Sequence, residues 1–413
     1  MEITTFNLSN PWRTGKNWDV PGIQRDVTRK LMNWLDEPEI LILSGARQVG
    51  KTSILYQLID WLMRSGHVGP DGIYYFNLDL GGISEFLEDQ GSFLRFLEAE
   101  KGRNIFVFID EVQRLPDPGI FIKAIQDLRL PIKFILTGSS SLDIRSRTHE
   151  PLTGRKQVFH IEALSFSEYV KTVPVLSSLP ALEQQSYSIY IGALNDALND
   201  YGLYGGYPAV VLTDDPEKKI LRLNEIFSSY LEKDIAGFLK VENIPAFRKL
   251  ATLLSVQQGG LVNIQELAST LGLHRETITR YIYYLEETFV IKRLTPLFTG
   301  KIIEGIVVSH VLRDRILSHR INYWRTKSGA EVDLIISGAK PVQSIEVKSG
   351  FLKGVTISRG YRSFLSKYSP KKAILLNSAI WSKREIAGHT VEAIPTTVFL
   401  LREPGSDKKG LNI

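Results

Sequence analysis

The sequence has no cysteine among its 413 residues, so disulfide bonds and cysteine-ligated metal sites are excluded. Its seven histidines form no H-E-x-x-H or similar pair, which argues against a zinc site. No apolar run approaches the roughly 18 residues that a membrane-spanning helix needs. The N-terminus, MEITTFNLSN, lacks the basic-then-apolar pattern of a signal peptide. We therefore expect a cytoplasmic location and no membrane partner.

The composition is that of a globular protein. Hydrophobic residues make up 43% of the chain, and the length is enough for roughly two to three domains. The net charge of +5 and the pI of about 9.0 permit a nucleic-acid partner without requiring one. The C-terminal tail, residues 403–413, is expected to be flexible.

The stretch GARQVGKT, from Gly45 to Thr52, matches the phosphate-loop pattern G-x-x-x-x-G-K-[ST] at every fixed position. An apolar run at Glu39–Leu43 predicts a buried strand before it, and Thr52–Arg64 has helical spacing after it. A strand, a glycine-bounded loop and a helix N-terminus form an anion cradle of backbone N–H groups. This context argues against a chance match. We expect Lys51 to reach the β- and γ-phosphates and Thr52 to ligate Mg²⁺. The residues expected to contact ATP here are Gly45, Ala46, Arg47, Gln48, Val49, Gly50, Lys51, Thr52 and Ser53.

A second apolar strand, in NIFVFIDEVQ, stops at two carboxylates, Asp110 and Glu111. Ligands of parallel α/β sheets bind beyond the C-terminal ends of the strands. Two acids at such an edge are unfavourable unless a cation or water is present. We expect Asp110 to hold Mg²⁺ through its water shell and Glu111 to polarise the attacking water. An acidic helix cap beside the sheet is the alternative.

Further strands are expected at Gly72–Leu80 and Ile132–Ser141. The intervening helices are expected at Gly22–Asp36, Ile83–Glu100 and Ile120–Leu128. Alternating strands and helices with short joins predict a doubly wound parallel sheet. The strand at Ile132–Ser141 ends in serines, of which Ser139 or Ser140 is expected to sense the γ-phosphate. A plain serine-rich turn is the alternative.

The segments GARQVGKT, FIDEVQRL, ILTGSSS and LTGRKQVFHIEALSFSEYV together resemble the prokaryotic AAA-type ATPases of the AAA+ superfamily. The resemblance is closest to the branch whose loop reads G-x-R-Q-V-G-K-T and whose C-terminal region is related to the restriction-endonuclease fold. It implies Mg²⁺-dependent ATP hydrolysis, with Lys51, Thr52, Asp110 and Glu111 in the roles given above.

The resemblance also suggests an arginine that contacts the γ-phosphate. Arg155 is the first candidate, and Arg145 and Arg147 are its rivals; solvated surface arginines are the alternative for each. For Arg47 we infer nothing beyond its proximity to phosphate. Related ATPases often form rings, so a homo-oligomer and an arginine acting in trans stay open.

The resemblance covers nearly the whole chain and implies a sequence of parts. These are a P-loop ATPase domain at 1–169, a helical lid at 170–240, a winged helix at 241–295 and an α/β restriction-endonuclease-like domain at 296–402. The lid contains a Gly/Pro-rich turn, GLYGGYPAVV, and an amphipathic helix, IFSSYLEKDI.

Within the third part, two expected helices, Ile264–Leu271 and Arg275–Glu286, are joined at Gly272, which is a helix-turn-helix pattern. The stretch FVIKRL, residues 289–294, suggests a strand and hence a winged variant. The polar face of the second helix would contact DNA through Arg275, Thr279 and Arg280. Bridging between domains, or binding a protein, is the alternative.

The last part contains Asp333 followed by Glu346-x-Lys348, which resembles the core of a restriction-endonuclease-like site. The strand period of two places Glu346 and Lys348 on one face. By this resemblance Asp333 and Glu346 would share Mg²⁺ and Lys348 would stabilise the developing charge, with Glu304 as an upstream acid. The residues leave two interpretations open. One is an ATPase coupled to a nucleic-acid-facing C-terminal half, with Mg²⁺-dependent nuclease activity on DNA or RNA as a refinement. The other is an ATP-switched regulatory module that binds DNA or protein through an inactive nuclease-like fold.

Overall fold

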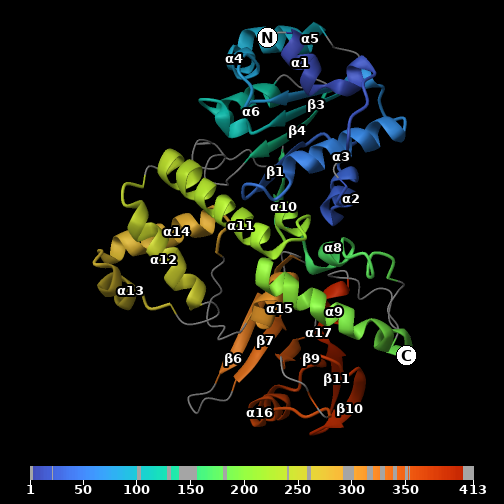
Figure 1. Ribbon diagram of the computed structural model, residues 1–413, viewed down its shortest axis with the longest axis vertical. Coiled ribbons are helices and arrows are strands. Elements are labelled where there is room, and N and C mark those ends of the chain that lie inside the picture. The colour runs from blue at the N-terminus through green and yellow to red at the C-terminus, as the bar shows by residue number, and fades with distance from the viewer. Residues whose placement is uncertain are drawn as a thin grey trace.

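The computed structural model describes residues 3–20, 22–99, 104–127, 132–138, 156–179, 184–239, 241–257, 262–291, 302–313, 320–325, 331–337, 342–348, 352 and 354–402. An N-terminal α/β region lies at the top of Figure 1, and a C-terminal α/β region lies at the bottom. Helices separate the two regions, and a group of them extends to the left. In the described part of the chain, no helix is long and apolar enough to cross a membrane.

The N-terminal region is built on a parallel sheet. Its strands are β1 (Ile40–Gly45), β2 (Ile73–Asn77), β3 (Ile105–Asp110), β4 (Ile132–Gly138) and β5 (Lys156–Ile161). They lie in the order β2-β3-β4-β1-β5, and every neighbouring pair is parallel. The predicted α/β architecture with a parallel sheet is confirmed. Because β4 lies between β1 and β3, the two chemical motifs end at the same edge, one strand apart.

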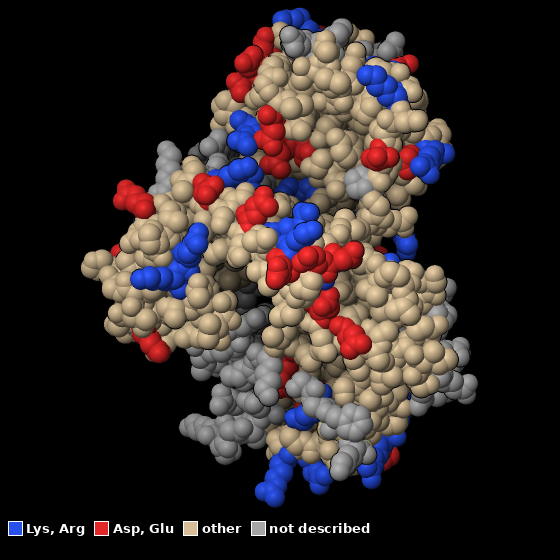
Figure 2. Space-filling view, viewed as in Figure 1, with Lys and Arg blue, Asp and Glu red and all other residues tan. Residues whose placement is uncertain are grey.

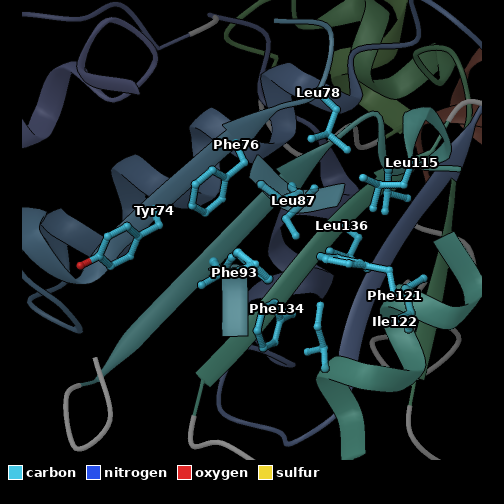
Figure 3. Close-up of a cluster of buried hydrophobic side chains, with 14 of the residues drawn as sticks. Tyr74, Phe76, Leu78, Leu87, Phe93, Leu115, Phe121, Ile122, Phe134 and Leu136 are labelled. Carbon is cyan, nitrogen blue, oxygen red and sulfur yellow. The ribbon is translucent and has the colours of Figure 1, made fainter. Parts of the chain in front are cut away.

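Helices cover both faces of this sheet (Figure 1). The helical segments are α1 (Ile3–Ser9), η1 (Pro11–Thr14), α2 (Asp26–Met32), α3 (Lys51–Arg64), η2 (Pro70–Gly72), α4 (Ile83–Glu88), α5 (Gln90–Ala99), η3 (Val112–Arg114) and α6 (Pro118–Asp127). Alternate residues of β1 face two cores: Leu41 and Leu43 pack with α2 and α3, while Ile40 and Ile42 pack with α4 to α6. Figure 3 shows aromatic and aliphatic side chains of the core that contains Ile40 and Ile42, gathered on one face of the sheet. Each fully buried Leu or Phe stabilises the fold by about 1.5–3 kcal/mol.

Two expected helices are shorter or divided. The helix expected at Gly22–Asp36 extends only over α2, from Asp26 to Met32. The helix expected at Ile83–Glu100 is interrupted at Asp89, whose carboxylate accepts hydrogen bonds from the backbone N–H and the hydroxyl of Ser92. Asp89 therefore starts a new helix, because a capping carboxylate satisfies the free N–H groups of a first turn.

The outer edge of β2 is closed by the N-terminal segment. Asn10 accepts a hydrogen bond from the Tyr75 backbone N–H at 2.7 Å and donates one to the Tyr75 carbonyl at 2.9 Å. Arg13 donates to the Ile73 carbonyl at 3.0 Å. These bonds replace a missing strand neighbour and fix the position of Tyr75.

The middle of the chain is helical. Its segments are α8 (Phe166–Val170), α9 (Gln184–Tyr204), α10 (Pro208–Val211), α11 (Pro216–Tyr230), the π-helix η4 (Leu231–Phe238), α12 (Ile244–Val256), α13 (Ile264–Leu271) and α14 (Arg275–Glu287). The expected turn at 202–211 is confined to the residues between α9 and α10. Residues 170–240, suggested as a lid, contribute to two cores: α9 packs against the C-terminal sheet, whereas η4 packs with α12 to α14.

The helices α13 and α14 are present as predicted and are joined at Gly272, whose φ of 64° is left-handed. On α14 the expected DNA-facing residues Arg275, Thr279 and Arg280 are exposed. The opposite face of α14 is buried and includes Ile278, Ile282 and Leu285.

The strand expected at 289–294 is absent from its described part, residues 289–291, and residues 292–294 lie outside the described residues. Phe289 has a φ of 65°, and its ring centroid lies 5.7 Å from that of His160 on β5. This left-handed backbone turns the chain at the point where an extended strand was expected.

The C-terminal region has a six-stranded sheet. Its elements are α15 (Ile302–Arg313), β6 (Arg320–Arg325), β7 (Glu331–Ser337), β8 (Gln343–Val347), α16 (Arg359–Tyr368), β9 (Lys372–Asn377), β10 (Ser382–Ile386), β11 (His389–Pro395) and α17 (Thr396–Leu401). The strand order is β10-β11-β9-β8-β7-β6. Strands β6, β7 and β8 are antiparallel neighbours, whereas β8, β9 and β11 are parallel. Helices α9, α15 and α17 pack on one face and α16 on the other.

Candidate functional site

The phosphate loop connects β1 to α3, and its glycines are required by the backbone. Gly50 has a φ of 95° at the start of α3, which favours a residue without Cβ. Gly45 pairs with Ile161 of β5, where an added Cβ would lie 2.1 Å from the Ile161 carbonyl oxygen. The loop is therefore shaped as the motif predicts, with the N-terminus of a 14-residue helix facing its opening.

Lys51 is buried and bends back over the loop. Its Nζ donates hydrogen bonds to the carbonyl oxygens of Gly45 at 3.0 Å and Ala46 at 2.9 Å. Burial lowers the pKa of Lys51, and the nearby charges of Glu111 and Asp110 oppose that shift. The ammonium group is thus held over the loop, where the charges of both acids act on it.

Asp110 is the centre of a hydroxyl network and is only 2% exposed. Its Oδ2 accepts hydrogen bonds from the hydroxyls of Thr52 at 2.7 Å and Tyr75 at 2.9 Å, and its Oδ1 accepts one from Thr137. A carboxylate has about four acceptor positions. Three of them are occupied by donors from α3, β2 and β4, so the network fixes the carboxylate beside Thr52.

Glu111 follows with a left-handed backbone, φ 62°, which is uncommon for a residue with a side chain. Its backbone N–H donates to the Thr137 hydroxyl at 2.9 Å, and its carboxylate accepts a hydrogen bond from Gln113. Thr137 therefore contacts both acids, as a donor to Asp110 and an acceptor from Glu111. Backbone strain of this kind is concentrated at functional sites.

Arg25 contributes to the site but was not predicted. Its Nη1 donates to the Val49 carbonyl of the phosphate loop at 2.8 Å, and its Nη2 donates to the Glu162 carbonyl at 2.7 Å. Its Nε is 3.0 Å from the Glu168 carboxylate, and both side chains are buried. The partners of Arg25 are far away in sequence, so no spacing pattern could predict these contacts. The capping box of α8, Ser165 with Glu168, was the one local pattern that could have been recognised.

The remaining predicted loop residues are distributed around this centre. Gln48 is exposed at the loop tip with a φ of 60°, and Ser53 lies in the first turn of α3. Arg47 points to Asp234 of η4, at Nε–Oδ2 2.8 Å. The predicted phosphate sensors Ser139 and Ser140 and the predicted arginines Arg145, Arg147 and Arg155 lie outside the described residues.

A second acidic group lies on the C-terminal sheet. Glu346 of β8 is 2% exposed, and its Oε1 is 2.7 Å from the Lys348 Nζ, so these side chains share a face, as the strand period predicts. Its Oε2 accepts a hydrogen bond from Ser358, the N-cap of α16, at 3.3 Å.

Asp333 reaches this group from the neighbouring strand. The register of β7 against β6 shifts between the pairs Asn322–Ile335 and Trp324–Val332, so β7 has one extra residue there. Such a bulge re-aims side chains and is frequent beside active sites. Asp333 lies within the bulge, and its Oδ2 accepts a hydrogen bond from the Val347 backbone N–H at 2.7 Å.

The charges of this second group act together on Lys348. Burial alone would lower the Lys348 pKa, but the hydrogen bond and charge of Glu346 raise it above its ordinary value. The charges of Asp333 and Glu304 act in the same direction. The structure therefore brings Asp333, Glu346 and Lys348 together, and the charge of Glu304 acts on the same lysine. In the described part of the chain, no cluster of three or more His, Asp or Glu side chains is arranged to hold a metal ion.

Three stretches of the chain match known domain families. Residues 37–170 match AAA_14, an AAA domain. They form an AAA domain. The phosphate loop, Asp110 and Glu111 all lie inside it. Residues 195–307 match DUF8612 and residues 299–397 match DUF4143, both domains of unknown function.

Relatives in bacteria and archaea are similar to much of the chain. An uncharacterized protein of Haemophilus influenzae is 27% identical over 277 residues, which cover 65% of this chain and 65% of that protein. One from Methanocaldococcus jannaschii is 24% identical over 351 residues, covering 76% and 75%. One from Mycobacterium tuberculosis is 24% identical over 383 residues, covering 83% and 77%. The chain thus spans about two thirds to three quarters of the length of these relatives.

Solved structures align weakly with the chain. A Walker-type ATPase of Pyrococcus abyssi has a TM-score of 0.42 at 14% identity, covering 67% of this chain and 93% of that one. AMPPCP-bound DnaA from Aquifex aeolicus has a TM-score of 0.28 at 14% identity, covering 68% and 94%. At TM-scores below 0.5, neither similarity assigns a function or a partner to this chain.

Proposed function

We propose that the AAA domain binds ATP at the phosphate loop and hydrolyses it. The observation that carries this proposal is the 2.7 Å hydrogen bond between Thr52 and Asp110. It joins the helix that follows the loop to the acidic end of a strand that lies two positions away in the sheet. A hydroxyl, a lysine and two acids from separate elements at one sheet edge are the groups that phosphoryl transfer uses.

The donor set at this edge suits magnesium. Mg²⁺ prefers oxygen ligands and is usually held by one or two carboxylates together with substrate phosphates. The Thr52 hydroxyl and the Asp110 carboxylate provide such oxygens. When bound, the ion would neutralise charge on the β- and γ-phosphate oxygens.

The chain's own residues have separable tasks in hydrolysis. Lys51 would exchange the carbonyl oxygens of Gly45 and Ala46 for phosphate oxygens, because an ammonium binds anionic acceptors more strongly than neutral ones. Glu111 would accept a hydrogen bond from the attacking water and orient it. Thr137 would keep Glu111 in place through the backbone N–H.

ATP turnover and nucleotide binding test this proposal. Lys51→Ala should reduce turnover by about 10²-fold or more, because a preorganised cation is removed from the transferring phosphate. Glu111→Gln should retain ATP binding and lower turnover by about 10²–10⁴-fold, as expected for loss of a catalytic base. Turnover unchanged in Lys51→Ala would refute the assignment, and lost binding in Glu111→Gln would make that residue structural.

We further propose that the C-terminal half faces nucleic acid. Figure 2 shows lysine and arginine side chains at the lower end of the molecule, over α16 and β10. The exposed basic residues of this end are Arg359, Arg362, Lys367, Lys371, Lys383 and Arg384. The patch begins at the N-terminus of α16, where Ser358 contacts Glu346. A cationic surface next to an acidic site suits a phosphodiester backbone.

The finer proposal is metal-dependent cleavage of that backbone by Asp333, Glu346 and Lys348. Two contacts support it: Glu346 pairs with Lys348, and Asp333 accepts a hydrogen bond from the backbone N–H of Val347, which lies between them. DNA and RNA should be incubated with Mg²⁺ or Mn²⁺ and with wild type, Asp333→Ala or Lys348→Ala. Cleavage that both substitutions abolish supports a nuclease. Cleavage insensitive to both would assign the activity elsewhere. Salt-dependent binding without cleavage favours the ATP-switched regulatory module.

A further inference from the structure

The phosphate loop is joined directly to the helical middle of the chain by an ion pair. The Nε of Arg47 lies 3.0 Å from Oδ1 and 2.8 Å from Oδ2 of Asp234. The two side chains are 19% and 9% exposed, and the residues are 187 positions apart in sequence. A partly buried pair of this kind is shielded from salt and water more than a surface pair.

Asp234 is placed by an unusual stretch of helix. The helix α11 continues into η4, a π-helix, where the backbone N–H of Leu239 donates to the Asp234 carbonyl at 2.9 Å. π-helical segments are rare and are frequent at functional sites. Leu231 and Ile235 of the same segment are buried against α12 to α14, so the helix is anchored on its other side. Asp234 therefore faces the phosphate loop from a fixed position.

The pair is close enough to affect the nucleotide pocket. Burial lowers the pKa of Lys51, and the charge of Arg47 lowers it further. The charges of Glu111, Asp110 and Asp234 act in the opposite direction. Five charged groups thus influence one another around the place where phosphates would lie. A polyphosphate bound at Lys51 would attract Arg47 and repel Asp234.

We propose that Arg47 is a second phosphate-contacting cation of the nucleotide site, and that Asp234 is the positioning residue that holds it in the nucleotide-free protein. A bound triphosphate takes the guanidinium from Asp234 and releases η4 from the phosphate loop. Nucleotide occupancy is thereby transmitted to the helices α12 to α14, which share a core with η4. This inference rests on the proposed binding of ATP.

Calorimetric titration with magnesium and the slowly hydrolysed analogue ATPγS tests the competition. Asp234→Asn should bind ATPγS about fivefold tighter or more, because the competing carboxylate is gone. Arg47→Gln should bind it about fivefold weaker or more. In the double variant the gain from Asp234→Asn should disappear, because there is no guanidinium to release. Unchanged or weakened binding by Asp234→Asn would overturn the proposal.

A matched control comes from the same helical region. Asp200 accepts a hydrogen bond from Lys219 of α11 at 2.9 Å, away from the loop. Asp200→Asn breaks an ion pair that does not involve the loop, with Lys219 11% and Asp200 44% exposed, and should leave ATPγS affinity unchanged. Lys51→Ala separates the two proposals. Suppose that wild type binds ATPγS and Lys51→Ala does not. If Asp234→Asn then binds ATPγS with unchanged affinity, only the present inference is refuted. If wild type binds none, the proposed function itself fails.

Hydrogen exchange of the wild-type protein provides a readout that does not depend on any variant folding. In wild type, saturating Mg·ATPγS should increase amide exchange in residues 231–239, because η4 loses its contact with the loop. Arg47→Gln should show this faster exchange without nucleotide. Unchanged exchange of 231–239 in saturated wild type would contradict the release of η4.

Discussion

The two acidic sites of this molecule are assembled in different ways. At Asp110, hydroxyl donors come from residues 58, 35 and 27 positions away, on three other elements. At Glu346, the cation is Lys348, two residues further along the same chain segment. The Asp110 network exists only when the whole sheet has formed, whereas the Glu346–Lys348 pair follows from the period of one strand. Asp333 joins that pair from β7, through a bulge. Substitutions should therefore affect fold and function together at the first site and mainly the local charge at the second.

The largest effect is expected at Asp110 itself. In Asp110→Asn an amide N–H₂ replaces one acceptor oxygen among three hydroxyl donors, so polar groups lose their partners. ATP turnover should fall by about 10²-fold or more, and the free energy of unfolding by about 1–3 kcal/mol. Turnover assays and chemical denaturation measure the two effects. Asp79→Asn, at an exposed pair with Arg114, is the control and should change neither. A stable, active Asp110→Asn would show that the network is dispensable.

Lowering the pH should destabilise the C-terminal region more than the AAA domain. His310 of α15 is buried, with its ring against Phe399 of α17. Burial lowers its pKa from 6.5 to about 4, with the charge of Arg313 acting in the same direction. Between these two pKa values the unfolded chain binds a proton that the folded chain does not. The free energy of unfolding should therefore decrease as the pH falls from about 6.5 to about 4, by about 3 kcal/mol in total.

Denaturation curves at pH 7, 5.5 and 4.5 measure this loss. His310→Gln provides the comparison, since a side chain without a titrating group should remove that part of the pH dependence. Equal acid sensitivity in wild type and His310→Gln would mean that other groups control it. Probes in the C-terminal half should report the loss before probes in the AAA domain, because His310 packs against Phe399 of α17.

Thr137 tests whether one hydroxyl positions both acids. Thr137→Val keeps the shape of the side chain but leaves the Glu111 N–H and a lone pair of Asp110 without this partner. We expect the free energy of unfolding to fall by about 1–3 kcal/mol and ATP turnover to decrease roughly tenfold. Thr137→Ser retains the hydroxyl and should behave like wild type. If Val and Ser variants lose equal activity, packing of the methyl group is responsible.

The same contrast explains what the sequence could predict. The phosphate loop and the two acids after β3 were predictable, because each motif is a continuous stretch flanked by apolar strands. Strand β5 was not predicted, since only Ile161 of its residues is buried and its pattern is weak. The roles of Tyr75, Thr137 and Arg25 depend on partners tens of residues away, so no spacing in the sequence indicates them.

The boundaries of helices were also only partly predictable from the sequence. The helix at Ile226–Ile235 was predicted from its amphipathic spacing, but α11 begins ten residues earlier at Pro216, where Asp215 caps it through the backbone N–H groups of Glu217 and Lys218. It widens into η4, whose Leu231 and Ile235 pack against α12 to α14, a contact that local spacing in the sequence does not reveal. The break at Asp89 depends on a capping carboxylate that competes with continued helix.

The smallest effect is expected for the coupling free energy of the Glu346–Lys348 pair. Measuring it compares the second acidic site directly with the site at Asp110. The Lys348 side chain is 37% exposed, so water screens its attraction to Glu346 even though the carboxylate is buried. A double-mutant cycle with Glu346→Gln and Lys348→Met should give a coupling of about 1 kcal/mol or less. The equivalent cycle with Asp110→Asn and Thr137→Val should give a larger value, because both partners there are buried. A coupling at Glu346 as large as that at Asp110 would show that the second site is enclosed as tightly as the first. The local strand period would then be insufficient to explain how it is built.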